Sequence, residues 1–350
     1  KLVSLCYKKL CMSKKNSSVN LKNGFKDFQD LSKIFHNFKK KLNAIKEKNF
    51  VIAVSGGPDS LALVALTKAY ANYKQSKFFY VLINHNIRKN SLVEAKKVKY
   101  LLKKENIRLK IISNKKKINK NIQSQARNIR YELLSNYCFK NNIRTLITGH
   151  NLEDQVETFL MRLSRGSGLR GLSAMSLKSK IDNNINLYRP LLEVKKNSLI
   201  KISKIIFGNF IKDPSNKNSK YLRTKIRSLK KPLEKSGVEY AQIFKSIRNL
   251  SESKKSLDNF LKQEFKGIIQ KKNKEIIINL TKFNNHNNEI KMAIINKSIK
   301  KLKNNYYDLR AKKVNNLIKV INKKNFKKST LGGCIFIKKG ENLHLKNENL

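Results

Sequence analysis

The hydrophobic pattern of this chain changes character between residues 50 and 70. Residues 50–54 form an unbroken apolar run rich in β-branched side chains, which is typical of a strand buried on both faces of a parallel sheet. Apolar residues then recur at helical spacing, at Leu61, Ala62, Ala65, Leu66 and Ala69. The pattern therefore predicts a strand, a short turn over residues 55–60, and a helix.

The same alternation continues through the first half of the chain. Further apolar strands are expected at residues 78–85, 108–113 and 144–150. Helical patterns are expected at residues 25–48, 93–102 and 123–141. Strands that alternate with helices of this length indicate βαβ units. We therefore predict an α/β fold, a Rossmann-like parallel sheet with helices on both faces, whose ligand lies at the carboxyl ends of the strands.

After Ser228 the pattern becomes mainly helical. Apolar positions at helical spacing, with lysine-rich outer faces, cover residues 229–265, 290–302 and 314–321. A short strand is expected at residues 275–280 and a small terminal element around residues 331–345. The prediction is thus a mainly helical C-terminal domain with a small terminal element.

The net charge of the chain indicates which class of partner it binds. The chain carries 78 Lys and Arg against 23 Asp and Glu, a formal net charge of +55. Such a field attracts polyanions, nucleic acid first, because neutralised phosphates release counterions. A compositional bias towards Lys, Asn and Ile is the alternative, but it does not account for the shortage of acids.

No apolar run reaches the roughly 18 residues of a membrane span, and the four cysteines form no paired motif. We therefore expect a cytoplasmic protein with no membrane partner.

The turn at residues 55–60 reads Ser-Gly-Gly-Pro-Asp-Ser. Gly56 and Gly57 let the backbone approach an anion closely, and the N-terminus of the following helix favours negative charge, so the turn suits a phosphate. It lacks the lysine of the Walker loop and the spacing of the dinucleotide fingerprint. It resembles the pyrophosphatase loop (PP-loop) of the N-type ATP pyrophosphatases, which implies cleavage of ATP between its α and β phosphates. The alternative is a structural Gly-Gly turn.

Residues 149–168 contain the second distinctive group. Asp154 and Glu157 are three positions apart, so both carboxylates share one face near the start of a helix, and His150 precedes them at a strand tip. Arg127 and Arg130 lie on an earlier helix. The carboxylates could serve only the helix dipole, but acidic groups beside an ATP loop favour a cationic co-substrate.

Several motifs together resemble those of the tRNA(Ile)-lysidine synthetases. They are S-G-G-P-D-S, H-N-I-R, A-R-x-x-R-Y, G-H-x-x-D/E-D-Q-x-E-T, L-x-R-G-S-G-x-x-G-L, R-P-L-L and D-P-S-N-x-x-x-x-Y-x-R-x-x-I-R. The matching residues are 55–60, 85–88, 126–131, 149–158, 163–172, 189–192 and 213–227, and residues 330–334 resemble a motif near the end of some members. The resemblance runs from about residue 45 to the end of the chain. Glu153 departs from the pattern, since members commonly have Asp there, but Asp154 is retained.

The resemblance implies an ATP-dependent ligase. Such an enzyme joins free lysine to the 2-carbon of the wobble cytidine in the CAU anticodon of an isoleucine tRNA, through an adenylated base. The product is lysidine, which changes codon recognition from AUG to AUA. ATP would be the co-substrate with Mg²⁺, the tRNA and free L-lysine would be the partners, and a homodimer is left open. The alternatives are another PP-loop tRNA-modifying enzyme, such as a thiolating one, or a non-catalytic basic RNA-binding protein.

The resemblance also implies roles for individual residues. ATP would be held by Ser55, Gly56, Gly57, Pro58, Asp59 and Ser60, with Asp59 also a Mg²⁺ ligand. Free lysine would be held by Arg130, Asp154 and Glu157, with His150 shaping the pocket, and the catalytic set would be Asp59, Asp154 and His150. The tRNA would be contacted by Arg165, Arg189, Arg223 and Arg227.

The expected domain organisation follows from these motifs. A basic N-terminal segment is left unassigned at residues 1–24. Three parts follow it: a PP-loop catalytic domain at 25–228, a helical tRNA-binding domain at 229–305, and a small C-terminal element at 306–350.

Overall fold

The computed structural model describes residues 21–88, 90–116, 118, 122–181, 185–211, 221–272, 274–303, 309–323 and 325–348. Most of the unassigned N-terminal segment lies outside the described residues, as do residues 213–220 of the last catalytic-domain motif. The chain folds into two compact units. One contains the described residues up to Thr158 and Met175–Phe244, and the other contains Phe159–Ala174 and Lys245–Leu350. The domain ranges expected from the sequence stay a prediction.

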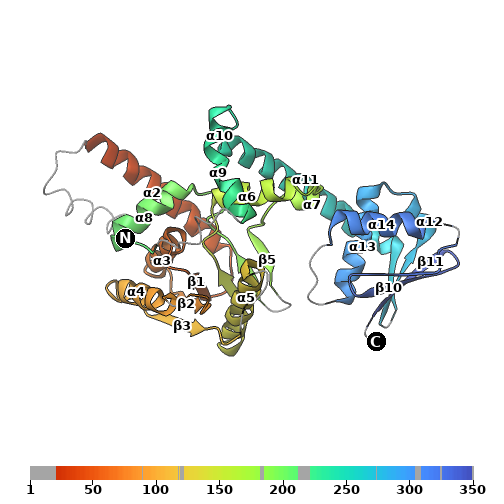
Figure 1. The fold of residues 1–350 in the computed structure, drawn as a ribbon, viewed down its shortest axis with the longest axis horizontal. Coiled ribbons are helices and arrows are strands. Elements are labelled where there is room, and N and C mark those ends of the chain that lie inside the picture. The colour runs from red at the N-terminus through yellow and green to blue at the C-terminus, as the bar shows by residue number, and fades with distance from the viewer. Residues whose placement is uncertain are drawn as a thin grey trace. The chain divides into compact units, whose positions relative to one another are not determined.

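The first unit is built on one sheet (Figure 1), which in the described part of the chain has the strand order β3-β2-β1-β4-β6-β5. The strands are β1 (Asn49–Val54), β2 (Lys77–Asn84), β3 (Leu109–Ser113), β4 (Thr145–Ile147), β5 (Lys178–Lys180) and β6 (Asn186–Tyr188). Neighbouring strands run parallel, except that β5 is antiparallel to β6. The direction of strand addition reverses at β1, because β2 and β3 lie on one side of it and β4 on the other. Ligands of such sheets bind where this reversal occurs, beyond the carboxyl ends of the strands.

Alternate residues of β1 enter two different cores. Phe50, Ile52 and Val54 pack with apolar residues of α2 (Leu21–Asn43), α3 (Pro58–Ala71), α4 (Ser91–Lys103) and α8 (Lys196–Phe207). Val51 packs in the other core with residues of α5 (Ile122–Lys140). The period of two along the strand thus buries both faces of the sheet. The predicted Rossmann-like sheet with helices on both faces is confirmed.

Four further helices remain to be placed in the chain. Two of them, α6 (Leu152–Leu163) and α7 (Leu169–Leu172), lie between β4 and β5, and the other two, α9 (Leu222–Ser228) and α10 (Lys230–Lys235), come after α8. The helix α6 begins just after β4, at the reversal point of the sheet, and α9 follows the residues 212–220 that are not described. None of the helices within the described ranges is both long and apolar enough to cross a membrane.

The second unit combines helices with an antiparallel sheet (Figure 1). Its longer helices are α11 (Tyr240–Ile268), α13 (Asn288–Leu302) and α14 (Ala311–Ile321), with the short α12 (Leu280–Asn284). Its strands, in the order β7-β8-β11-β10-β9, are β7 (Ile269–Lys272), β8 (Glu275–Asn279), β11 (Asn342–Asn347), β10 (Cys334–Lys339) and β9 (Lys328–Leu331). Side chains of both layers, including Ile276, Phe283, Ile299 and Phe336, form one core. The helical C-terminal region is confirmed, and the predicted strand and terminal element belong to one sheet.

Candidate active site

The turn at residues 55–60, which we call the ATP loop, connects β1 to α3. Gly56 has a φ of +80°, a conformation that favours glycine. The Ser60 hydroxyl closes the loop, since it accepts a hydrogen bond from the Ser55 N–H at 3.1 Å and donates one to the Gly57 carbonyl at 3.0 Å. Because α3 begins at Pro58, the N–H groups of its first turn lie at the loop and lack intrahelical partners. The loop therefore has the geometry of an anion-binding turn.

Two glycines permit close packing around this loop. A Cβ on Gly56 would lie 2.4 Å from Cγ2 of Val98, and the Gly56 carbonyl accepts a hydrogen bond from the Ile211 N–H at 2.9 Å. A Cβ on Gly149, two residues after β4, would lie 2.8 Å from the Asp59 carbonyl oxygen. The turns that follow β1 and β4 can approach each other this closely because position 149 has no side chain.

The Asp59 side chain lies beside the acidic residues of the second motif. Burial raises the pKa of Asp59 to about 6; Lys196 opposes this shift, whereas the negative charge of Asp154 adds to it. The Oδ1 atom of Asp59 is buried and has no hydrogen-bond partner among the described residues. A buried carboxylate oxygen without a donor is suited to an oxygen-preferring cation such as Mg²⁺.

Asp154 and Glu157 of α6 face two arginines of α9. Arg223 donates from Nη2 to Oδ1 of Asp154 and from Nε to Oε2 of Glu157, both at 2.6 Å. Arg227 donates from Nε to Oε1 of Glu157 at 2.7 Å and from Nη2 to Oε2 at 3.0 Å. Burial acts to lower the pKa of Arg223, but Asp154 and Glu157 outweigh it and raise that pKa. The two carboxylates thus bind nitrogen cations, and in this structure those cations are two arginines of the chain itself.

The start of α6 is fixed by reciprocal hydrogen bonds. The Asn151 N–H donates to Oδ2 of Asp154 at 3.1 Å, and the Asp154 N–H donates to Oδ1 of Asn151 at 2.9 Å. Such a pairing satisfies backbone donors at a helix start and holds the acidic side chain in one orientation. Glu153, the residue that departs from the family pattern, accepts from the Lys196 N–H at 2.8 Å and from Lys230 Nζ at 3.3 Å. Glu153 therefore joins α6 to α8 and α10.

Two histidines of the site are neutral at pH 7. Arg130 Nε lies 3.3 Å from Nε2 of His85, and burial together with this arginine lowers the pKa of His85 to about 4. Nδ1 of His150 lies 2.8 Å from the Thr148 hydroxyl. Burial, followed by the charge of Arg189 and of three other arginines, lowers the pKa of His150 well below its ordinary value of 6.5.

The arginines predicted to contact tRNA have different surroundings. Arg165 is exposed, in the turn after α6 within the second unit. Arg189 is only 7% exposed and donates to the Ser176 carbonyl at 3.0 Å and to the Ser179 hydroxyl at 2.9 Å. Arg223 and Arg227 pair with the carboxylates of α6, as described above. A tRNA contact by any of the four stays a prediction.

The structure therefore brings several predicted site residues to one edge of the sheet. Asp59 interacts electrostatically with Asp154, and His150 with Arg130 and Arg223. Sequence reasoning did not single out Asn151, Lys196 or Lys230. Only Asn151 had a local signal, since an Asn three residues before an Asp at a helix start is typical of a cap. The two lysines are distinguished from the many others by tertiary contacts alone.

The sequence of this chain matches a known family and several known proteins. The family model for the PP-loop domain matches residues 30–233. The tRNA(Ile)-lysidine synthase of Wolbachia pipientis wMel is 33% identical over 315 residues, which are 88% of this chain and 72% of that protein. The tRNA(Ile)-lysidine synthase of Orientia tsutsugamushi is 42% identical over 185 residues, which are 52% of this chain and 41% of that protein.

A solved structure supports the fold. The U34-tRNA thiolase NcsA of Methanococcus maripaludis aligns with a TM-score of 0.54 at 20% sequence identity, covering 63% of this chain and 78% of that one. At that identity the likeness concerns the fold alone. It agrees with the parallel sheet and its surrounding helices.

Proposed function

Because the chain belongs to the tRNA(Ile)-lysidine synthase family of PP-loop ATP-using ligases, we propose that it joins free lysine to the wobble cytidine of an isoleucine tRNA with a CAU anticodon. The observation that carries the proposal is the meeting of an anion-binding loop and a cation-binding carboxylate pair at one edge of the sheet. The phosphates of ATP would be the anion that the loop binds, and the ammonium of lysine would be the cation that the carboxylate pair binds.

The reaction needs two displacements. The 2-carbonyl oxygen of cytidine attacks the α-phosphorus of ATP, the bond to the bridging oxygen breaks, and pyrophosphate leaves. The ε-amine of lysine then attacks C2 of the adenylated base, the C2–O bond breaks, AMP leaves with that oxygen, and the amine loses a proton. Adenylation is required because a carbonyl oxygen is a poor leaving group. Phosphoryl transfer of this kind depends mainly on positioning and charge neutralisation.

The ATP loop has the groups needed for the first displacement. The backbone around Gly56 and Gly57 and the start of α3 would hold the pyrophosphate part of ATP. The unpartnered Oδ1 of Asp59 is the atom that would hold Mg²⁺, which would neutralise charge on the phosphates. Burial is the largest cause of the raised pKa of Asp59, and a bound cation would act against it, as Lys196 does.

The carboxylate pair would serve the second displacement. Asp154 and Glu157 already bind cationic N–H donors, and an ammonium group would be a further donor of this kind for Asp154, the more exposed of the two. Arg130 beside His85 would bind the carboxylate of lysine. Neutral His150 would shape the pocket, and the amine proton would pass either to His150 or to a carboxylate.

The remaining partners complete the proposal. Arg165, Arg189, Arg223 and Arg227 are the proposed tRNA contacts, and the charge of +55 favours a polyanionic substrate. A cytoplasmic location goes with these substrates. Whether the working form is a homodimer is a separate question that sedimentation would answer.

Incorporation of labelled lysine into tRNA tests the proposal. The purified protein should attach [¹⁴C]lysine to an isoleucine tRNA transcript with cytidine at the wobble position, with release of AMP and pyrophosphate. A transcript with uridine at that position should take up no label. Asp59→Ala should abolish ATP–pyrophosphate exchange, and normal exchange would remove Asp59 from the mechanism. Tight tRNA binding without any ATP consumption would instead indicate a non-catalytic RNA-binding protein and would refute the enzyme assignment.

A further inference from the structure

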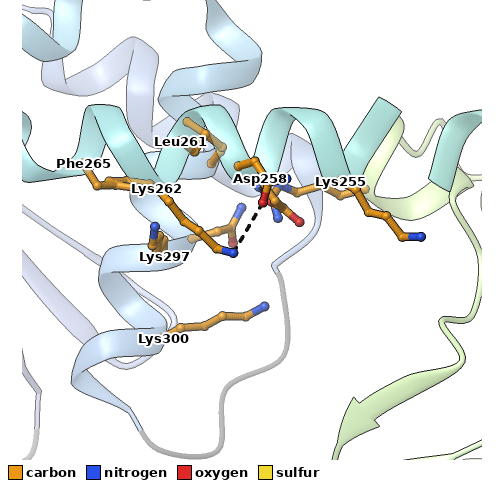
Figure 2. Close-up of a pocket in the computed structure, with 11 residues that line it drawn as sticks. Lys255, Asp258, Leu261, Lys262, Phe265, Lys297 and Lys300 are labelled. Carbon is orange, nitrogen blue, oxygen red and sulfur yellow. Dashed lines mark hydrogen bonds and ion pairs between the residues drawn. The ribbon is translucent and has the colours of Figure 1, made fainter. Parts of the chain in front are cut away.

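The second unit has a cavity of about 520 Å³ between α11 and α13 (Figure 2). Lysines of both helices line it, among them Lys262 and Lys297, and both helices belong to the residues already expected to bind tRNA. This cavity therefore adds no new class of ligand. A histidine at the end of β2, in the first unit, does.

His85 lies beside the ATP loop at the edge of the sheet. The strands β1 and β2 are parallel, and Val54, the last residue of β1, is opposite Leu82 of β2. The ATP loop begins directly after Val54, and His85 directly follows β2. Both turns therefore leave the same carboxyl edge of the sheet, and none of the steps above gives the His85 imidazole a contact with a substrate.

Asparagines hold the backbone around His85 in place. The Asn114 N–H donates to the Asn84 carbonyl at 2.7 Å, and Nδ2 of Asn86 donates to the Asn114 carbonyl at 2.8 Å. Nδ2 of Asn84 also donates to Oδ1 of Asn86 at 2.7 Å. Asn86 has a φ of +54°, a conformation that Asn tolerates better than most residues other than glycine. The imidazole of His85 is thus carried on a backbone that is fixed on both sides.

The neighbouring arginine determines which ring nitrogen of His85 carries the proton. Nε and Nη2 of Arg130 both lie 3.3 Å from Nε2 of His85. A guanidinium group has donors only, so Nε2 of His85 accepts and carries no hydrogen. Burial and Arg130 lower the pKa of His85 to about 4, so the ring is neutral at pH 7. Its single N–H is therefore at Nδ1.

This N–H group has no acceptor within the described part of the chain. Nδ1 of His85 is buried and makes no hydrogen bond with any residue that the structure describes. A buried donor that has lost water without gaining an acceptor destabilises a fold, so such groups are rare outside functional sites. Oδ1 of Asp59 is likewise buried and without a partner. The edge of the sheet thus carries an unpartnered acceptor after β1 and an unpartnered donor after β2.

We propose that the Nδ1–H group of His85 donates a hydrogen bond to the adenosine part of ATP, at a ribose oxygen or a purine nitrogen. The inference rests on ATP being the co-substrate, as proposed above. In Rossmann-like sheets the phosphates lie at the turn after β1, and the ribose is contacted from the end of the next strand. Adenosine offers uncharged acceptors, which suit a neutral N–H donor.

This placement also separates the two small substrates. The strand β2 lies on one side of β1, and β4, which leads to the carboxylate pair on α6, lies on the other. With adenosine on the β2 side, the lysine amine can approach from the β4 side. The α-phosphate of ATP would then lie between them, at the ATP loop.

Two amide substitutions test the donor in the full-length protein. The amide nitrogen of Asn can take the place of Nδ1 of His, whereas that of Gln takes the place of Nε2. His85→Asn should therefore keep KM for ATP within about threefold of the wild-type value, and His85→Gln should raise it on the order of tenfold. KM for lysine should be unchanged in both. An equal rise of KM for ATP in the two variants, or a rise of KM for lysine alone, would overturn the assignment.

The imidazole signal of His85 in the wild-type protein gives a readout that does not depend on activity. In ¹⁵N NMR this signal, identified by its loss in His85→Asn, should move when AMP or ATP is added. Deoxy analogues of ATP locate the acceptor, since a shift lost with 2′-deoxy- or 3′-deoxy-ATP assigns the ribose and a shift kept with both assigns the purine.

The same titration separates this inference from the function on which it rests. A shift with lysine or pyrophosphate but not with AMP would overturn the adenosine contact, and so would the absence of a shift with any of them. Failure of lysidine formation, with the AMP-dependent shift intact, would refute the proposed function and leave the contact of His85 with adenosine standing.

Discussion

Glu157 on α6 and Arg223 on α9 are 66 positions apart in the chain, and their side chains meet with 2.6 Å between Nε and Oε2. The Glu157 side chain is only 3% exposed and also accepts hydrogen bonds from Arg227. A single buried carboxylate therefore holds two guanidinium groups and ties α9 to the carboxyl edge of the sheet. We therefore expect this pairing to contribute to the stability of the site.

Glu157→Gln should destabilise the fold strongly. The substitution leaves Arg223 and Arg227 without their shared anion in a partly buried place, and breaking such a pair costs about 3 kcal/mol. The free energy of unfolding in urea measures the effect. Glu132→Gln is the control, because its ion pair with Lys116 is exposed, and the expected loss there is below about 1 kcal/mol. Equal losses in the two variants would show that the buried pair is not special.

Gly149→Ala should impair ATP use rather than folding alone. Its new Cβ would lie 2.8 Å from the Asp59 carbonyl oxygen, so the ATP loop or the turn after β4 must shift. A displacement of this kind at a reacting site can reduce kcat/KM on the order of 100-fold. Steady-state kinetics with varied ATP measures it. Gly267→Ala, in α11 and with 3.8 Å to its nearest neighbour, should leave the kinetics unchanged, and a comparable loss there would exclude the steric explanation.

The His85 imidazole should titrate near pH 4 in the folded protein. Burial and Arg130 hold the pKa of His85 below its ordinary value of 6.5. As the pH falls, His85 therefore takes up a proton at a higher pH in the unfolded chain than in the folded protein. Its contribution to the stability of the fold is thus present above pH 6.5 and is lost as the pH falls towards 4. Histidine NMR signals followed against pH measure the pKa directly.

Arg130→Gln should raise the pKa of His85, because it removes the neighbouring cation. Arg127→Gln is the matched control, since Arg127 acts on His150 rather than on His85. If both substitutions left the His85 titration unchanged, burial alone would account for its low pKa.

The strand–turn–helix around the ATP loop was predictable because its signals are local. Residues 50–54 are continuously apolar, and the glycines of the turn follow at once, so no distant contact is needed to recognise the unit. The partners of Asp154 and Glu157 were not predictable in this way. With 78 Lys and Arg in the chain, nothing local distinguishes Arg223 and Arg227 as the cations that pair with α6.

The antiparallel sheet of the second unit was also only partly visible in the sequence. The strand β8 is rich in isoleucine and was expected, but β9 reads Lys-Ser-Thr-Leu and has one strongly apolar residue. Such an edge strand is held by pairing with β10, with Ile335 opposite Thr330. Its formation depends on a partner that is itself placed by the tertiary fold.

Asn151→Ala should show whether the Asn151 side chain only caps α6 or also helps to orient Asp154. The substitution removes the acceptor for the Asp154 N–H, and loss of a helix cap costs about 1 kcal/mol. The Asn151 N–H that donates to Oδ2 of Asp154 remains, but loss of the reciprocal bond loosens the turn that holds this carboxylate, so lysidine formation should fall and KM for lysine should rise. Asn287→Ala is a matched control, because Asn287 caps α13 by accepting from the Ile290 N–H at 3.1 Å. The control should lose similar stability in urea unfolding yet retain its KM for lysine. If both variants raised that KM equally, the orientation of Asp154 by Asn151 would not be the cause.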